Sequence, residues 1–397
     1  MNYPRKILSQ LQSQLARGKS VLLIGARQTG KTTLLQHLDA GRRINLMDTS
    51  VRRRYEMRPE LLVQEIRTEA KTYAGTLLVI IDEIQKVPAL LDNIQILIDE
   101  QIAQFVLTGS SARKLRQPPV NLLPGRVVKL HLDPLMLNEI PADEYDLENC
   151  LLYGTLPGIF SETHIDNKAL DLASYVDIYL EEEIRAEALV RKVGEFSRFL
   201  ELAAAESGYV VNMNKLSNDV AVSRSTLDTY FQILEDCLIV ERITPVTETK
   251  TRRRLLKSNR YLFYDLGVRR LAANEGTHLP EKIMGHLFEQ FVGQQLIAML
   301  RQSVPQARVS FWQDSNGVAV DWVVCLNRQY VPIEVKCSDA PKPHAAKHCE
   351  TFINEYDCPL GGFVVCQTPH AYQLTDHVKA MAWQQLPELC QRIAHLS

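Results

Sequence analysis

Strand-like segments recur through the first third of the chain, and each ends in or is followed by small or polar residues. They are VLLI (21–24), RINLMD (43–48), LLVIID (77–82) and QFVLTGSS (104–111). After the first of them, Leu34, Leu35 and Leu38 fall on one side of a helix expected over 31–38. Strands that alternate with helices are typical of a parallel sheet, so this part is predicted to be an α/β domain.

Helical spacing dominates the middle of the chain. Helices are expected over 174–188 and 196–208, and two more form a helix-turn-helix pattern around a tight turn at Val222–Ser223. The second helix of this pattern has a buried stripe made of Leu227, Phe231, Leu234 and Leu238, and Ser225 is expected to cap it. Strands follow at 238–246 and 260–265, as in the wing of a winged helix.

The last third combines a long helix with strands. An amphipathic helix is expected over 281–300, followed by a hairpin over 309–326 that turns at Asn316–Gly317. Another strand is expected over 329–338. These elements indicate a second α/β domain.

Length and composition narrow the class of protein. The chain has 397 residues, of which 46% are hydrophobic and 23% charged, and its formal net charge is −2. This length suits roughly two to four domains, and any nucleic-acid contact must come from a local patch. No apolar run approaches the ~20 residues that span a bilayer, and no signal-peptide pattern opens the chain. The eight Cys include no C-x-x-C pair, which favours reduced thiols and a cytoplasmic protein.

The stretch GARQTGKTT (25–33) fits the phosphate-binding pattern G-x-x-x-x-G-K-[ST] between the expected strand and helix. The two glycines allow the loop to turn its N–H groups towards phosphates. Lys31 is expected to reach the β- and γ-phosphates of ATP, and the Thr32 hydroxyl to bind Mg²⁺. The predicted ATP-binding residues are Gly25, Ala26, Arg27, Gln28, Thr29, Gly30, Lys31, Thr32 and Thr33.

Two carboxylates follow the apolar strand over 77–82. Asp82 is predicted to hold the same Mg²⁺, and Glu83 to polarise the water that attacks the γ-phosphate. The alternative is an exposed acidic turn after a core strand. If the strand over 104–111 lies beside the strand that precedes the loop, Thr108 or Ser110 would reach the γ-phosphate as a sensor. Arg126 is a candidate arginine finger for a neighbouring subunit's site.

The ordered motifs GARQTGKTTLL, IIDEIQKVP, VLTGSS, LPGR, LDPLMLNEI and YGTLPG resemble a prokaryotic group of AAA+-type ATP-binding proteins. In this group a C-terminal domain of unknown function is fused to the ATPase. The resemblance extends over almost the whole chain, including a basic stretch before Asp265 and Gly267. It implies an ATPase core of the additional-strand type, with Glu83 as base and Arg126 as a finger acting in trans. It also implies a homo-oligomer, for which a hexameric ring is one form.

The densest positive segment is KTRRRLLKSNR (250–260), which falls between the two strands of the expected wing and has six basic residues and no acid. Basic wings contact phosphates, and this favours DNA as a partner. The predicted DNA-contact residues are Arg224, Thr226, Arg252, Arg253, Arg254, Lys257 and Arg260. The alternative is that the winged helix connects proteins and its arginines lie in solvent.

Four residues of the last third resemble the PD-(D/E)XK restriction-endonuclease-like superfamily. Glu289 lies on the expected helix, Asp321 on a hairpin strand, and Glu334 and Lys336 share a face of the next strand. Asp321 and Glu334 can share a metal ion, Glu289 can complete its shell, and Lys336 can orient the attacking water. Relatives often have a Glu where this chain has Ala319, and nuclease-like folds used only for binding are common.

His344, His348 and Cys349 are interpreted as helix surface rather than as a zinc site, because the sequence shows no fourth ligand.

The expected architecture is an α/β, AAA+-type P-loop core with a parallel sheet, followed by a helical lid, a winged helix-turn-helix and a restriction-endonuclease-like α/β domain. The corresponding ranges are 1–145, 146–195, 196–275 and 276–397.

Two functions of different classes fit this architecture. The first is an ATP- and Mg²⁺-dependent ATPase that binds and acts on DNA through its C-terminal regions. The second is a nucleotide-dependent switch with slow or no turnover, which serves as a protein-interaction platform with an inactive nuclease-like domain. Glu83 favours turnover because it supplies a base. A third idea, an ATP-regulated transcription factor, explains the winged helix but not the nuclease-like residues.

Overall fold

The computed structural model describes residues 3–111, 123, 125–176, 193–248, 254–276 and 278–396. The chain folds into two compact units, Met1–Asp133 with Ile233–Ile239 and Pro134–Gln232 with Val240–Ser397. Arg252, Arg253 and most of the helix expected over 174–188 lie outside the described residues.

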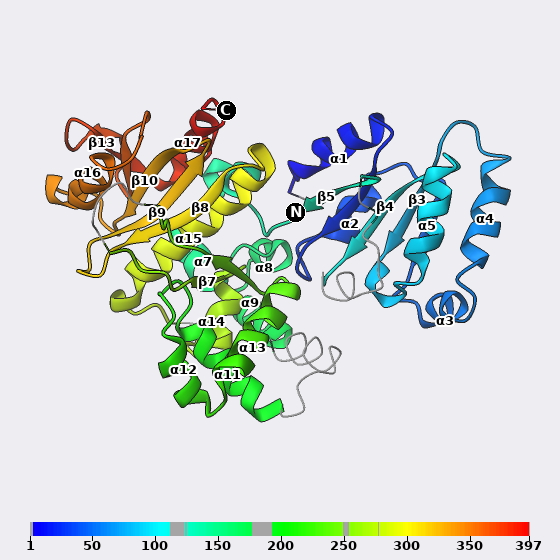
Figure 1. Ribbon diagram of the computed structural model, residues 1–397, viewed down its shortest axis with the longest axis horizontal. Helices are drawn as coiled ribbons and strands as arrows, with labels where there is room; N and C mark the ends of the chain where they lie inside the picture. Colours follow the sequence, from blue (N-terminus) through cyan, green and yellow to red (C-terminus); the bar gives the residue numbers. More distant parts are fainter. Residues whose placement is uncertain are drawn as a thin grey trace. The chain divides into compact units, whose positions relative to one another are not determined.

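The first unit is built on a five-stranded sheet in the order β2-β3-β4-β1-β5, and every pairing in it is parallel (Figure 1). Its strands are β1 (Ser20–Ile24), β2 (Arg42–Asn45), β3 (Leu77–Asp82), β4 (Ala103–Gly109) and β5 (Val127–His131). This confirms the α/β fold with a parallel sheet that the alternating pattern predicts. β4 lies between β3 and β1, with Val106 opposite Val21. The strand that carries the candidate sensor Thr108 therefore lies beside the strand that precedes the phosphate-binding loop, as the sensor role requires.

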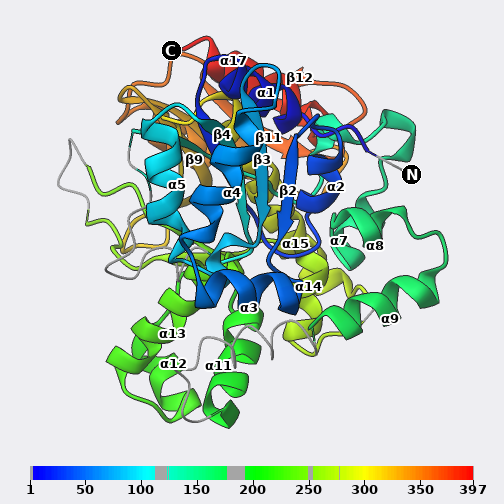
Figure 2. The same ribbon diagram turned by 90° about the vertical axis from the view of Figure 1, so that its right-hand side faces the viewer.

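Helices cover both faces of this sheet (Figure 2), because successive strand residues point to opposite sides. In β1, Val21 and Leu23 pack with residues of α1 and α2, whereas Leu22 and Ile24 pack with residues of α3, α4 and α5. These helices are α1 (Ile7–Ala16), α2 (Lys31–Gln36), α3 (Thr49–Met57), α4 (Leu61–Ala70) and α5 (Leu90–Asp99). The carboxyl ends of the strands are therefore held in place by helices packed on both faces of the sheet.

The second unit begins with helices that surround α14 (Leu266–Ala272), which contacts α7, α9 and α11. The described elements of this unit before α11 include the short 3-10 turns Leu137–Glu139 and Ala142–Glu144, then α7 (Leu147–Tyr153), α8 (Pro157–Ser161) and α9 (Ile165–Tyr175). The helix expected over 196–208 is α11 (Val193–Ala205).

The helix-turn-helix pattern corresponds to α12 (Met213–Val220) and α13 (Arg224–Asp236). Leu227, Phe231 and Leu234 are buried, as the spacing predicts. The prediction for Leu238 is wrong, because this residue lies beyond the end of α13 and is half-buried. The predicted cap, Ser225, is wrong by two residues, because the Thr226 N–H donates to Ser223 Oγ at 3.2 Å. The two strands that follow, β6 (Val240–Ile243) and β7 (Arg260–Phe263), pair antiparallel.

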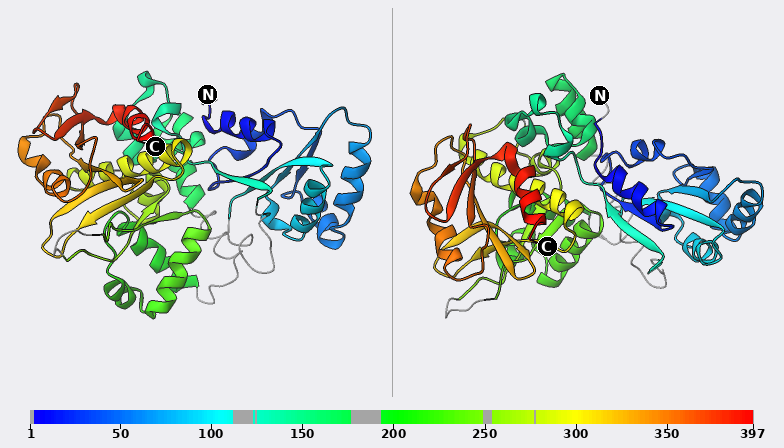
Figure 3. Two further views of the ribbon diagram at one scale, coloured as in Figure 1. Left: turned by 45° about the horizontal axis from the view of Figure 1, so that its top comes forward. Right: turned by 90° about the horizontal axis from the view of Figure 1, so that it is seen from above.

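The second unit also holds a six-stranded mixed sheet in the order β12-β13-β11-β10-β9-β8, which runs from yellow to red-orange in Figure 3. Its strands are β8 (Arg308–Gln313), β9 (Ala319–Leu326), β10 (Gln329–Val335), β11 (Gly362–Cys366), β12 (Tyr372–Gln373) and β13 (Val378–Ala382). The helices beside it are α15 (Glu281–Ser303), α16 (Lys347–Ile353) and α17 (Leu386–Ala394). A Cβ at Gly293 of α15 would lie 2.1 Å from the Trp322 ring, so this glycine lets α15 pack closely on β9.

Asp265 ties the YGTLPG motif to the start of α14. Its carboxylate is 1% exposed, and it accepts from the N–H groups of Thr155 at 2.7 Å and Val268 at 3.1 Å. Gly154 has a φ of 73°, and a Cβ there would lie 2.1 Å from Asp265 Oδ1. A Cβ at Gly267 would lie 2.3 Å from Tyr153 O. Two motifs that are far apart in sequence thus form one tightly fitted corner.

We expect this corner to give the protein a pH-dependent stability. Burial raises the pKa of Asp265 from 3.8 to about 6, although backbone N–H groups of Thr155 and Val268 lower it. The folded state therefore binds more protons than the unfolded state between these values, and the free energy of unfolding falls as pH rises from about 4 to about 6. The upper bound is about 3 kcal/mol, from about 1.4 kcal/mol per pKa unit.

The measurement is the Tm of wild type and Asp265→Asn across this pH window. The Tm of the wild type minus the Tm of Asp265→Asn should decrease as the pH rises from about 4 to about 6. Asp146→Asn is the matched control, because Asp146 caps α7 through Asn149 N in an exposed position. A gap that does not change with pH would contradict the assignment.

Candidate functional site

The phosphate-binding loop joins β1 to α2 at the carboxyl edge of the first sheet. A Cβ at Gly25 would lie 2.4 Å from Leu132 O, so only glycine fits there. Gly30 has a φ of 93°, in the left-handed region that favours glycine. Thr29 is fully buried, and its hydroxyl donates to Ala26 O at 2.9 Å. The loop geometry is therefore fixed by its own residues.

Lys31 lies inside this loop as the first residue of α2, and it is 6% exposed. Its Nζ donates to Gly25 O at 2.8 Å and to Ala26 O at 2.9 Å. The ammonium group is thus held at the concave side of the loop, where the phosphates of a nucleotide are predicted.

Asp82, at the end of β3, accepts hydrogen bonds from two hydroxyl groups. Thr32 Oγ1 donates to Oδ2 at 3.0 Å, and Thr108 Oγ1 donates to Oδ1. Thr108 in turn accepts from the Glu83 N–H at 3.0 Å. The structure therefore brings the two predicted Mg²⁺ ligands together with a predicted sensor. Hydroxyl and carboxylate oxygens suit Mg²⁺, so the residues fit the ion that the resemblance implies.

Glu83 follows with a φ of 61°, which is uncommon for a residue other than glycine. Its carboxylate Oε2 accepts from Ser110 Oγ at 2.8 Å and from Gln85 Nε2. Asp82 is only 8% exposed, and Glu83 is half-buried. These contacts are not those of an exposed acidic turn, so that alternative is wrong. Gln85, which sequence reasoning missed, follows Glu83 by two residues.

Arg126 lies before β5 and forms a two-pronged ion pair with Asp99. Arg126 Nε is 2.6 Å from Asp99 Oδ1, and Nη2 is 2.9 Å from Oδ2. This hydrogen bonding lowers the pKa of Asp99. The two side chains are 33% and 46% exposed, so the pair is open to water.

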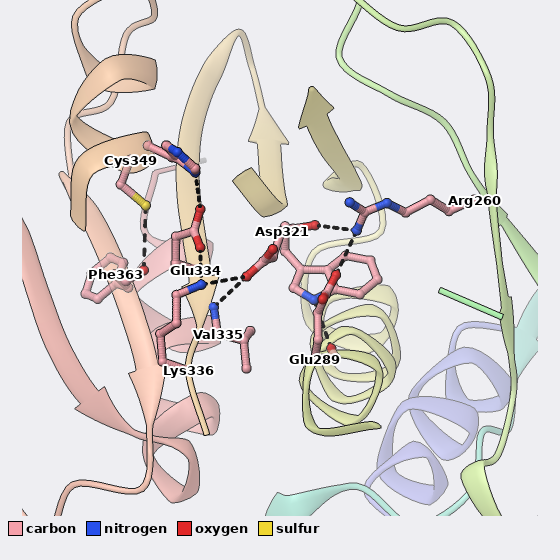
Figure 4. Close-up of polar contacts among 10 residues, drawn as sticks. Arg260, Glu289, Asp321, Glu334, Val335, Lys336, Cys349 and Phe363 are labelled. Atoms are coloured by element: carbon pink, nitrogen blue, oxygen red, sulfur yellow. Dashed lines mark hydrogen bonds and ion pairs between the residues drawn. The ribbon is translucent and has the colours of Figure 1, made fainter. Parts of the chain in front are cut away.

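In the second unit, Asp321 of β9 and Glu334 of β10 lie on either side of Lys336 (Figure 4). Lys336 Nζ is 2.7 Å from Glu334 Oε2 and 3.9 Å from Asp321 Oδ2. Asp321 Oδ2 also accepts from the Val335 N–H at 2.8 Å. Three of the four nuclease-like residues thus form one group, as their positions on neighbouring strands predict.

Burial makes this group electrostatically unusual. It raises the pKa of Glu334 to about 8, and the Asp321 charge adds to the effect while Lys336 opposes it. Burial also lowers the pKa of Lys336, but the carboxylates of Asp321 and Glu334 outweigh it and raise that pKa overall. Strongly perturbed carboxylates beside a lysine are more frequent at functional sites than in ordinary cores.

Glu289 lies on the other side of Asp321, and its partner is Arg260. Arg260 Nη1 is 2.9 Å from Glu289 Oε1 and 3.2 Å from Asp321 O, and its guanidinium lies 4.3 Å from the Phe311 ring centre. Burial and the Asp321 charge raise the pKa of Glu289 to about 7, against the effect of Arg260. Arg260 is 7% exposed, so its predicted contact with DNA phosphate is wrong. It is an internal counter-ion.

The interpretation of Cys349 as helix surface is also wrong, because this thiol is fully buried. His348 is 39% exposed, and its Nδ1 lies 3.7 Å from Glu334 Oε1. It therefore borders the group of Asp321, Glu334 and Lys336. Within the described parts of the chain, no three His, Cys, Asp or Glu side chains are already arranged to hold a metal ion.

The remaining predicted DNA-contact residues are at the surface. Arg224, Arg254 and Lys257 are exposed, and Thr226 is half-buried. The segment with Arg254 runs along the β8–β9 hairpin, because Ser315 N donates to Arg254 O at 2.9 Å and Leu256 N donates to Gln313 O at 3.0 Å. The basic segment therefore belongs to the same unit as the group of Asp321, Glu334 and Lys336.

In the ranges that the structure describes, no helix is long and apolar enough to cross a membrane.

Three family models match the chain over successive stretches. Residues 17–141 match a model described as an AAA domain. Residues 144–278 and 284–386 match two models described as domains of unknown function (DUF8612 and DUF4143). Together with the phosphate-binding loop and the parallel sheet, the first match supports an AAA-type, nucleotide-dependent ATPase domain at residues 17–141.

Two curated relatives are uncharacterized proteins of Mycobacterium bovis and Mycobacterium tuberculosis. Each is 25% identical over 351 residues, which cover 85% of this chain and 74% of the relative.

Similar solved structures include the Aeropyrum pernix Orc1 protein in complex with DNA. It has 16% identity and a TM-score of 0.28, over 69% of this chain and 92% of that one. The Pif1 helicase of Candida albicans has 18% identity and a TM-score of 0.25, over 44% and 48%. Protein VC1899 of Vibrio cholerae has 9% identity and a TM-score of 0.22, over 95% and 97%. Scores this low support no conclusion about this chain.

Proposed function

We propose that the protein is an ATP- and Mg²⁺-dependent ATPase that binds DNA and couples hydrolysis to its second unit. The observation that carries this proposal is the convergence of Lys31, Thr32, Asp82, Thr108 and Glu83 at the carboxyl edge of one parallel sheet. Each of these side chains has a distinct task in phosphoryl transfer.

The Lys31 ammonium binds the β- and γ-phosphate oxygens, and the loop N–H groups bind the phosphates around it. Thr32 and Asp82 hold Mg²⁺, which neutralises phosphate charge when bound. Thr108 keeps the Asp82 carboxylate oriented through its hydrogen bond. Glu83 takes a proton from the attacking water as general base.

Arg126 suits the role of a finger that acts on a neighbouring copy of the chain. Its ion pair with Asp99 is open to water, and such pairs contribute little to stability. Arg126 can therefore exchange Asp99 for the γ-phosphate of a nucleotide bound to another subunit. This requires a homo-oligomer.

DNA is the proposed partner of the second unit. Helices α12 and α13 with the β6–β7 pair suit a winged helix, and Arg224, Arg254 and Lys257 are exposed for phosphate contacts. The group of Asp321, Glu334 and Lys336 suits metal-dependent cleavage of a phosphodiester, in which the carboxylates hold the ion and the ammonium orients water.

A second candidate is a nucleotide-dependent regulatory switch and protein-interaction platform with an inactive nuclease-like domain. The specific observation in its favour is the Arg260–Glu289 ion pair, which occupies the carboxylate expected to complete the metal shell. If this pair persists with DNA bound, Asp321 and Glu334 alone must hold the ion.

For the ATPase, we expect Glu83→Gln to keep nucleotide binding and to lower kcat by about 10²–10⁴-fold, since a general base contributes that much. Phosphate release and the affinity for a fluorescent ATP analogue are measured with Mg²⁺. Glu100→Gln is the matched control, because Glu100 pairs with Arg67 on the surface. Equal turnover by wild type and Glu83→Gln would refute the role of Glu83.

For DNA, we expect the double variant Arg254→Ala/Lys257→Ala to bind duplex DNA more weakly at every sequence. The slope of log affinity against log salt should decrease by about two, one for each lost phosphate contact. Arg198→Ala/Lys282→Ala removes the same charge from exposed positions elsewhere in the unit and should change neither quantity. A wild type that neither binds DNA at low salt nor hydrolyses ATP faster with it would rule out DNA as the partner.

For cleavage, we expect Lys336→Ala to abolish Mn²⁺- or Mg²⁺-dependent cutting of DNA while the ATPase rate stays unchanged. The control is Lys342→Ala, at an exposed lysine outside the group. Cutting that is equal in wild type and Lys336→Ala would come from a contaminant, and a wild type that does not cut would favour the switch.

A further inference from the structure

Gln85 is a buried polar side chain beside Glu83 that the proposed mechanism does not use. It lies in the 3-10 turn Ile84–Lys86 after β3 and is 4% exposed. Its Nε2 donates to Glu83 Oε2 and to Ser110 Oγ at 3.1 Å. Ser110 Oγ in turn donates to Glu83 Oε2 at 2.8 Å. The three side chains form a closed triangle.

Both donors in this triangle act on the same carboxylate oxygen. A carboxylate only accepts, so the amide nitrogen of Gln85, rather than its oxygen, faces Glu83. Among the described residues, no side chain or N–H group donates to Glu83 Oε1. Oε2 is therefore fixed while Oε1 keeps its capacity to take a proton.

The orientation of Gln85 has a structural cost. Its Oε1 is buried and finds no hydrogen-bond partner in the described ranges, and buried unsatisfied acceptors are destabilising. A Cβ at residue 109 would lie 3.0 Å from this oxygen, so Gly109 provides its space. Within the part of the chain that the structure describes, the Gln85 side chain makes no hydrogen bond to a main-chain group of another element. The Gln85 amide thus carries an unsatisfied oxygen, and its described hydrogen bonds go to Glu83 and Ser110. We therefore expect it to act through Glu83.

We infer that Gln85, together with Ser110, is a positioning residue that orients Glu83 for hydrolysis, an inference that rests on the proposed ATPase function. In the reaction, the water oxygen bonds to the γ-phosphorus while the bond from that phosphorus to the β,γ-bridging oxygen breaks. ADP leaves with that electron pair, and the water proton passes to Glu83 Oε1. Fixing Oε2 holds Oε1 in the direction of the attacking water.

The test is Gln85→Met, which keeps the side-chain volume and removes both the donor and the unsatisfied oxygen. A hydrogen bond to a charged group is lost, so kcat should fall by about 10- to 100-fold. KM and the affinity for a fluorescent ATP analogue should not change, because within the described residues the side-chain hydrogen bonds of Gln85 go to Glu83 and Ser110 and not to the phosphate-binding loop. The Tm should stay the same or rise, whereas a merely structural role predicts a lower Tm.

Ser110→Ala is the milder second variant, and its kcat should fall in the same way. Gln104→Ala is the matched control, since Gln104 lies on the neighbouring β4 and its Nε2 donates to Leu15 O at 2.9 Å. Gln104→Ala should lower the Tm through the loss of this bond and leave kcat unchanged. In a Glu83→Gln background, Gln85→Met should cause no further loss, because residues that act as a unit are not additive.

The outcomes separate this inference from the function on which it rests. Normal wild-type turnover with an unchanged kcat for Gln85→Met and Ser110→Ala overturns the inference alone. A further loss of the same size in the Glu83→Gln background also overturns it, because Gln85 would then act independently of Glu83. A wild type that binds ATP but hydrolyses none overturns both.

Discussion

The carboxylate of Asp82 is the point on which the ATP site depends. It accepts from Thr32 at the start of α2 and from Thr108 near the end of β4, so one side chain joins three elements. This is possible because β4 lies between β3 and β1, which brings all three strand ends to one edge. With β4 on the outside of the sheet, Thr108 would be a surface residue and Glu83 would lose its contact with that strand.

The sequence predicts those parts of the molecule whose determinants are close together along the chain. The loop over 25–33 and the pair Asp82–Glu83 follow directly from their neighbours. Arg260 could not be predicted in this way. It ends a basic run and therefore suggests a surface charge, but it is buried against Phe311 and paired with Glu289. Gln85 was missed because its partner Ser110 follows a different strand, β4. The position of His348 beside Glu334 was not foreseen because Glu334 lies on another element. The available signal was a further polar residue, Gln85, two positions after Glu83 in the IIDEIQ stretch.

The carboxylate group of the second unit is governed by the balance between burial and counter-charge. Three acids, Glu289, Asp321 and Glu334, share two cations, Arg260 and Lys336. Burial is the largest cause of the raised pKa values of Glu289 and Glu334, so removing the acids from water outweighs their ion pairs. Well-packed apolar side chains in the same place would avoid this desolvation free energy. The group therefore lowers the stability of the fold relative to an apolar core of the same size.

The position of β4 also decides when the first unit can form during synthesis. Val21 of β1 pairs with Val106 and Val128, so the strand that leads into the phosphate-binding loop has no partner among the residues made shortly after it. At about 5–20 residues per second, the ribosome takes on the order of ten seconds to deliver both partners. Once the VLLI segment has left the ribosome and until both partners are made, it is an unpaired apolar segment that chaperones can bind and that can aggregate.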